Sequence, residues 1–189
     1  MDKLQHKSMI STSQYFGSVA ICQSTCNWAF IDIQNLYKAT KYSGWKLDLK
    51  KFREYLAVEL NVIRAIFFMG YIERNEWLYK KIKKAGFEIE FRSVRLLSNG
   101  IVDGGNVDAD IASFLMDNKY SYNKAVVVAN DGDYAKMCQS LVRQNKLAMV
   151  ISSNVMRLTS NYIKQEVPRE LIMSINSIRP IVESKLKVE

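Results

Sequence analysis

The strongest constraint on the fold is a short apolar run that ends in an acidic turn. Residues 125–129 (AVVVA) contain no polar side chain, and the turn 130–133 (NDGD) follows at once. A short, wholly apolar run of this kind is typical of a parallel strand that is covered on both faces. In open α/β sheets, ligands bind at the carboxyl ends of such strands. The sequence therefore predicts a buried strand whose acidic end faces a ligand site.

Other segments alternate between the two kinds of secondary structure. Apolar or alternating patterns predict strands at residues 28–33, 61–69, 87–92 and 147–151. Helical spacing predicts helices at 49–60, at 71–86 with Gly86 as its stop, from Asp108 onward, and at about 133–144. Strands that alternate with helices favour an α/β fold with a parallel or mostly parallel sheet.

The length of 189 residues suits one domain with small appendages. We expect residues 1–26 to form an N-terminal tail or lead-in and residues 27–153 to form the domain. Residues 154–189 are expected to form a helical extension packed on it, with Pro168 and Pro180 as breaks.

The charge balance favours a polyanionic partner. Lys and Arg number 27 against 19 acidic residues, a formal charge of +8, which favours nucleic acid ahead of an anionic membrane. Three cysteines and a single histidine, His6, argue against a zinc site and are consistent with reduced thiols. No segment predicts a membrane span or a signal peptide, so we expect a cytoplasmic protein with no membrane partner.

Four aspartates are the candidate metal ligands. Asp32 ends the first predicted strand, Asp108 opens a helix, and Asp131 and Asp133 lie in the acidic turn. Carboxylates that meet at one sheet edge repel each other unless a cation or protons neutralise them, and Mg²⁺ or Mn²⁺ suits an all-carboxylate site. The alternative is that Asp108 and Asp133 simply cap helices.

Two neighbouring polar residues have subordinate roles in this hypothesis. Asn35 either orients a carboxylate or caps the following helix, and Asp110 is a second-rank candidate because it lies two residues from Asp108. Nucleotide-cofactor and Ser-His chemistry are not indicated, since no P-loop, GxGxxG after a strand, or GxSxG occurs.

Basic and aromatic side chains provide candidate RNA contacts. The basic candidates are Lys80, Lys81, Lys83, Lys84, Arg92 and Arg95, with Lys119 and Lys124 as further members. In the helix 71–86, Trp77, Leu78 and Ile82 are expected to form the apolar face, and the alternative for the lysines is a solvated surface. Candidates for base stacking are Tyr37, Tyr42, Trp45, Tyr71, Tyr120 and Tyr122, with packing as their alternative role.

Three motifs in order resemble the NYN domain, a family of the PIN-like nuclease superfamily, and in particular its LabA-like branch. They are FIDIQNLY (30–37), GNVDADIASFLMD (105–117) and VVVANDGDY (126–134). The resemblance covers roughly residues 27–153. It implies a Rossmann-like, PIN-like three-layer α/β/α sandwich with a mostly parallel central sheet.

The resemblance also implies a function. Asp32, Asp108, Asp131 and Asp133 match the family's acidic positions and Asn35 matches their companion, so all five become candidate catalytic residues. The expected activity is that of an endoribonuclease that uses Mg²⁺ or Mn²⁺ to cut single-stranded or structured RNA. A homodimer is a further possible partnership.

Two alternatives remain open at this stage. Ile33 and Gly104 stand where many family members carry glycine and lysine, which motivates an RNA-binding or scaffold module without catalysis. A phosphatase or other metal hydrolase acting on a small phosphate ester is the third hypothesis, because acid-tipped sheets also serve that chemistry.

Overall fold

The computed structural model describes residues 26–92, 95–96, 102–103, 107–152 and 159–185. The predicted lead-in up to residue 25, Gly104, and the side chain of Arg95 lie outside this description. Within the described residues, no helix combines the length and apolar character needed to cross a membrane.

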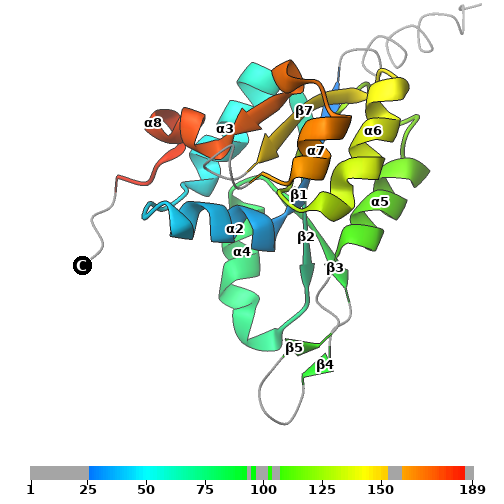
Figure 1. Cartoon of the computed structure of the whole chain (residues 1–189). Coiled ribbons are helices and arrows are strands. Elements are labelled where there is room, and N and C mark those ends of the chain that lie inside the picture. Colours follow the sequence, from blue (N-terminus) through cyan, green and yellow to red (C-terminus); the bar gives the residue numbers. More distant parts are fainter. Residues whose placement is uncertain (1–25, 93–94, 97–101, 104–106, 153–158, 186–189) are drawn as a thin grey trace, which may run out of the picture.

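Six parallel strands form the central sheet, in the order β3-β2-β1-β6-β7-β8 (Figure 1). They are β1 (Asn27–Asp32), β2 (Val62–Gly70), β3 (Glu88–Arg92), β6 (Ala125–Val128), β7 (Leu147–Ser152) and β8 (Ile172–Ser174). A second, two-stranded antiparallel sheet pairs β4 (Arg95–Leu96) with β5 (Val102–Asp103).

Helices cover both faces of the six-stranded sheet (Figure 1). One face packs against α2 (Ile33–Tyr42), α3 (Leu49–Leu60), α4 (Glu76–Lys84) and α8 (Arg179–Val182). The other packs against α5 (Asp108–Asp117), α6 (Ala135–Arg143) and α7 (Asn161–Glu166). Short 3-10 turns complete the chain: η1 (Glu73–Asn75), η2 (Gly132–Tyr134), η3 (Arg169–Leu171) and η4 (Ile175–Ile178). The predicted three-layer α/β/α sandwich is confirmed.

The apolar run in β6 shows why the sheet needs both helical layers. Ala125 and Val127 belong to the core on the α5–α6 side, whereas Val126 and Val128 belong to the core on the α2–α3 side. All four are at most 2% exposed. A strand without polar residues is stable here because successive side chains point to opposite, equally covered faces.

The strand order reverses between β1 and β6. From β1 the chain adds β2 and β3 on one side, and from β6 it adds β7 and β8 on the other. The helices that follow β1 and β6, α2 and α6, consequently pack on opposite faces of the sheet. Such a reversal opens a crevice at the carboxyl ends of the two strands, which is the usual ligand position in open α/β sheets.

Two details differ from the sequence expectation. Trp77 is not part of the buried face of α4: it is 65% exposed, and Tyr79 is buried in its place beside Ile82, whose burial was predicted. Tyr79 and Ile82 lie three residues apart and so share one helical face, from which Trp77 is rotated away. The C-terminal part, expected to be helical, also supplies strand β8, which pairs with β7.

The predicted stop of α4 is confirmed, since Gly86 follows it with φ +88°, a conformation that favours glycine.

Candidate functional site

Asp32 ends β1 and caps α2 from a buried position. It is 4% exposed, and its Oδ1 accepts hydrogen bonds from the backbone N–H groups of Gln34 (2.8 Å) and Asn35 (3.0 Å). Its Oδ2 accepts hydrogen bonds from the side-chain amide of Asn35 and from the hydroxyl of Tyr134. Four donors thus fill the acceptor positions of one carboxylate. The predicted contact between Asn35 and an aspartate is present, and it fixes the orientation of Asp32.

Tyr134 links Asp32 to Asp108. The residue lies directly after the acidic turn, is 1% exposed, and places its hydroxyl 3.0 Å from Oδ2 of Asp32. Burial, together with the neighbouring carboxylates of Asp32 and Asp108, raises the pKa of the Tyr134 phenol far above its ordinary value. The phenol therefore keeps its proton, which it donates to Asp32 of β1, and the carboxylate of Asp108 from α5 lies beside it.

Asp131 and Asp133 are exposed, in contrast to Asp32. Asp131 caps η2, and its side chain accepts one long hydrogen bond, 3.4 Å, from the backbone N–H of Asp133. Asp133 lies inside η2 and does not cap α6, so the capping role considered for it belongs to Asp131. Both carboxylates point toward solvent at the carboxyl end of β6, where an incoming ligand can reach them.

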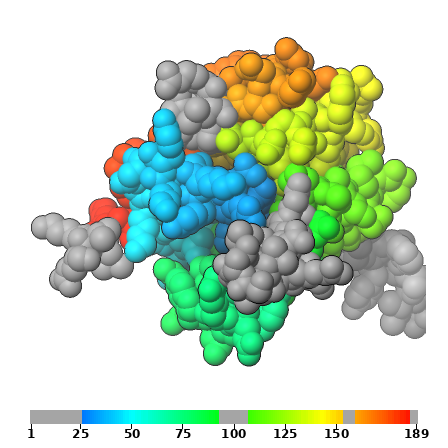
Figure 2. Space-filling model, turned by 60° about the horizontal axis from the view of Figure 1, so that its bottom comes forward, coloured from blue at the N-terminus to red at the C-terminus, as the bar shows by residue number. Residues whose placement is uncertain are grey.

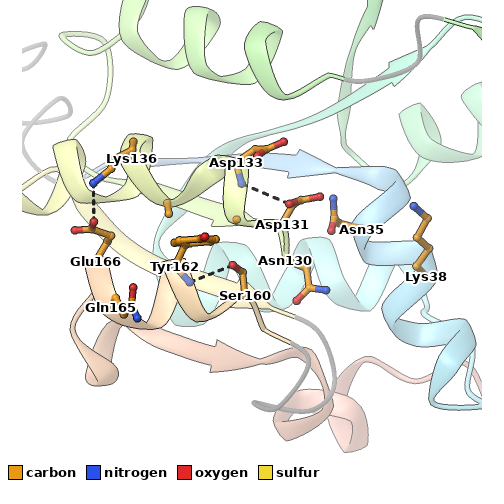
Figure 3. Close-up of a pocket in the computed structure, with 12 residues that line it drawn as sticks. Asn35, Lys38, Asn130, Asp131, Asp133, Lys136, Ser160, Tyr162, Gln165 and Glu166 are labelled. Atoms are coloured by element: carbon orange, nitrogen blue, oxygen red, sulfur yellow. Dashed lines mark hydrogen bonds and ion pairs between the residues drawn. The ribbon is translucent and has the colours of Figure 1, made fainter.

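A cavity of about 890 Å³ opens beside this turn (Figure 3). Asn35 and Asp131 lie next to each other at its wall, and Lys38 lies one helical turn farther along α2. The surfaces of α2 (blue), the segment after β6 (yellow-green) and α7 (orange) succeed one another in Figure 2. The lining residues are Asn35, Lys38, Asn130, Asp131, Gly132, Asp133, Ala135, Lys136, Ser160, Tyr162, Gln165 and Glu166. The crevice at the strand reversal is thus a real cavity, walled by three segments of the chain.

The predicted aspartates gather into two groups. Asp32, which is buried, and Asp108, which is half-buried, flank Tyr134, and Asp131 and Asp133 line the cavity. Within the described residues, no three His, Cys, Asp or Glu side chains are arranged closely enough to form a metal-binding group. Asp110 forms an exposed ion pair with Arg92 (3.0 Å) and so faces away from this pair, as its spacing from Asp108 predicted.

The predicted RNA contacts are only in part available at the surface. The four lysines of α4 are exposed, but none of them lines the cavity. Among the aromatic candidates, Trp45 and Tyr122 are buried, and Trp45 donates a hydrogen bond from Nε1 to Asn176 (2.7 Å), so stacking on bases was the wrong expectation for both. Tyr37, Tyr42, Tyr71 and Tyr120 are exposed.

Several residues of the site were not predicted. Tyr134 has a sequence signal, because it directly follows the acidic turn, and so has Lys38, which lies one helical turn after Asn35. Ser160, Tyr162 and Glu166 have none, because they reach the cavity through the packing of α7 on α6 and η2.

Thiol chemistry is not a property of this region. Cys138, on α6, is fully buried, and burial raises the pKa of its thiol to about 12. A thiol that stays protonated at neutral pH is a poor nucleophile, so Cys138 is a core residue.

Comparisons with known proteins agree with this architecture. The sequence model of the NYN domain matches residues 28–174, without distinguishing branches of the family. A solved structure of a protein of unknown function from Vibrio parahaemolyticus is similar, with a TM-score of 0.67 and 18% sequence identity. The alignment covers 86% of this chain and 98% of that one, and at this identity the likeness shows the fold alone. No curated protein gives a significant match.

Proposed function

The chain belongs to the NYN domain family, and from that premise we propose that it is a ribonuclease that depends on a divalent metal ion. Its active site is the carboxyl edge of β1 and β6. The observation that carries the proposal is the position of the four aspartates at the reversal of strand order, around Tyr134 and along the cavity.

The donor set fits Mg²⁺ or Mn²⁺. All four candidates are carboxylates, the hard oxygen ligands that these ions prefer. Mg²⁺ is commonly held by one or two carboxylates, with water and substrate phosphate at the other positions. Asp32 and Asp108 would hold the ion, and Asp131 and Asp133 would complete the site directly or through water. Bound there, a divalent ion would activate water and stabilise the negative charge that develops on a phosphodiester.

The protein's own residues prepare Asp32 for this role. Asn35 and Tyr134 both donate to Oδ2, so ligand binding at this oxygen requires one of them to release it. The two backbone donors to Oδ1 hold the carboxylate at the start of α2 meanwhile. Oδ1 thus keeps the carboxylate in its orientation while Oδ2 exchanges a protein donor for the ligand. Asn35 acts as a positioning residue.

Basic residues would hold the RNA backbone outside this centre. Lys38 lines the cavity, and among the residues that the structure describes no carboxylate forms an ion pair with it. The exposed lysines of α4 provide a second, more distant positive surface, on which we propose non-specific phosphate contacts. Arg92 is tied to Asp110 and contributes less.

The test is cleavage of end-labelled single-stranded RNA with Mn²⁺, with Mg²⁺ and with a chelator. We compare the wild type with Asp131→Asn and with Asp117→Asn, a matched control because Asp117 is also exposed but lies at the far end of α5. We expect metal-dependent cutting by the wild type and the control, and background cutting by Asp131→Asn with an unchanged circular dichroism spectrum. Cutting in the presence of chelator, or full activity of Asp131→Asn, would contradict the proposal.

A second candidate function is RNA binding without catalysis. Two observations favour it: protein donors fill every acceptor position of Asp32, and no three-carboxylate group is present among the described residues. Retention of RNA by the wild type without turnover in any divalent metal would place this function first.

A further inference from the structure

We propose that the cavity beside the acidic turn binds an unpaired nucleotide of the RNA, with its base stacked on Tyr162 and a flanking phosphate near Lys38. This inference rests on the proposed function and sharpens it: the substrate class is single-stranded RNA. Tyr162 was not among the aromatic residues that the sequence singled out.

Tyr162 has the exposure and the position of a stacking platform. Its side chain is 67% exposed although it lines the same cavity as Asp131 and Asp133 (Figure 3). One edge of the ring lies against Gly132, since a Cβ added to Gly132 would lie 3.0 Å from Cδ2 of Tyr162. A side chain at this position would crowd the ring, so glycine favours the close approach. The aromatic ring therefore stands immediately beside the two exposed carboxylates.

The platform is held in place relative to the acidic turn. The backbone N–H of Ser160 donates to the carbonyl oxygen of Asn130 (3.3 Å), and Oγ of Ser160 accepts from the backbone N–H of Tyr162 (3.2 Å). At the other end of α7, Glu166 pairs with Lys136 of α6 (2.7 Å). Ile163 between them is fully buried. A stacking surface anchored at both ends loses little freedom when a base binds.

The opposite wall supplies a positive charge. Lys136 is paired with Glu166, whereas Lys38 is exposed and, within the described part of the chain, has no carboxylate in an ion pair. Asn35 and Lys38 are three residues apart and so share the face of α2 that lines the cavity. The cavity thus combines a polar wall, an aromatic platform and an ammonium group, which together suit a nucleotide. Its volume of about 890 Å³ is within the usual range of small-molecule pockets.

The geometry selects unpaired bases. Stacking on an aromatic side chain needs a base whose face is open, and in a duplex both faces are covered by neighbouring base pairs. Double-stranded RNA should therefore bind only through its phosphates, without using Tyr162.

The experiment measures fluorescence anisotropy of a labelled single-stranded oligoribonucleotide and of its duplex, in chelator so that no cutting occurs. The variants are Tyr162→Ala, Tyr162→Phe and Lys38→Ala, with Tyr120→Ala as control because Tyr120 is 78% exposed and does not line the cavity. We expect Tyr162→Ala to weaken single-strand binding by about tenfold, the effect of losing one base stack. Tyr162→Phe and Tyr120→Ala should stay within about twofold of the wild type, Lys38→Ala should weaken both RNAs, and the duplex should not respond to Tyr162→Ala.

Gly132→Ala is a second test that retains the Tyr162 ring but disturbs its position. A Cβ at position 132 would lie 2.8 Å from Oγ of Ser160 and 3.0 Å from Cδ2 of Tyr162, so the Ser160 hydroxyl and the ring must both shift. We expect a loss of single-strand affinity with unchanged duplex affinity.

Each result bears on the inference. It is overturned if Tyr162→Ala binds single strands like the wild type, if it weakens single strand and duplex equally, or if wild type binds neither RNA. If the wild type binds neither RNA and shows no metal-dependent cutting, the proposed function is contradicted as well. Wild-type cutting with unchanged binding by Tyr162→Ala would overturn the inference alone.

Discussion

The turns after β1 and β6 make an informative comparison because they begin alike. Each follows a buried parallel strand, each opens with an aspartate that caps the next helical segment, and the two strands are neighbours. Asp32 is 4% exposed and accepts four hydrogen bonds, whereas Asp131 is exposed and accepts one long one.

The difference teaches that tertiary surroundings, not the local motif, decide what a strand-end aspartate does. Asp32 is enclosed because α2 and Tyr134 lie over it, so its charge is held by fixed donors. Asp131 stands at the wall of the cavity, where its charge faces solvent and any ligand. We therefore call Asp32 the framework aspartate of the proposed site, because it is buried and held in one orientation before a ligand binds, and Asp131 its surface aspartate.

Asp32→Ala should have the largest effect and test this assignment directly. The change removes the buried carboxylate that accepts from the Tyr134 hydroxyl, from the Asn35 amide and from the first turn of α2. Hydrogen bonds to a charged group contribute about 1.5–3 kcal/mol each, and a lost helix cap costs about 1 kcal/mol. We expect a loss of about 3–4 kcal/mol in the free energy of unfolding, measured by urea denaturation.

Asp131→Ala is the matched control for the second turn. It removes only a weak cap, so the loss should be below about 1 kcal/mol. Equal losses for the two variants would erase the distinction between framework and surface aspartates.

Addition of Mn²⁺ should stabilise the folded protein and show which aspartates bind the ion. An ion that binds only the folded protein raises the free energy of unfolding by about 2.7 kcal/mol at 100 times its dissociation constant. We expect a gain of this size for wild type, reversed by chelator, and a gain below about 0.5 kcal/mol for Asp108→Asn at the same Mn²⁺ concentration. A full gain in Asp108→Asn would remove Asp108 from the proposed site. The readout is again urea denaturation.

Much of the fold follows from patterns that are local in the sequence. The apolar runs at 28–33 and 125–129 predicted β1 and β6 because buried parallel strands need no polar face. Strand β8 was not predicted, because its three residues, Ile172–Ser174, are too few to show an alternating pattern and their pairing depends on β7. Trp77 was assigned to the apolar face of α4 together with Leu78 and Ile82, although Tyr79 has the better spacing relative to Ile82.

In the site, too, local contacts could be predicted from the sequence and long-range contacts could not. Asn35 and Asp32 are three residues apart, so their contact follows from the start of a helix. The hydroxyl of Tyr134 reaches Asp32 across 102 residues of sequence, and no local pattern contains that information. The position of Tyr162 depends in the same way on how α7 packs against α6 and η2. Sequence reasoning placed the aspartates and Asn35 at this edge of the sheet and missed Tyr134 and Tyr162, whose positions depend on tertiary packing.

Tyr134→Phe should show what the hydroxyl contributes to Asp32 and Asp108, because it removes that group alone. The ring remains and fills the same space, while Asp32 loses one donor and the charges of Asp32 and Asp108 lose a shared neighbour. We expect a loss of about 1–2 kcal/mol in the free energy of unfolding without metal. Because the hydroxyl also competes for Oδ2 of Asp32, the stabilisation by Mn²⁺ should be at least as large as in wild type. A smaller stabilisation would show that Tyr134 assists binding instead of competing with it.

Asp110→Asn should have the smallest effect, although Asp110 lies only two residues from Asp108 on the same helix. Its carboxylate pairs with Arg92 at the surface, with both side chains more than a third exposed. Exposed ion pairs contribute about 0–1 kcal/mol, so the free energy of unfolding should fall by no more than about 0.5 kcal/mol. Stabilisation by Mn²⁺ should match wild type, because the i and i+2 positions of a helix do not face the same ligand. If Asp110→Asn abolished the response to Mn²⁺ as Asp108→Asn is expected to do, the acidic site would extend along α5 toward β3, and the division between framework and surface carboxylates at β1 and β6 would no longer describe it.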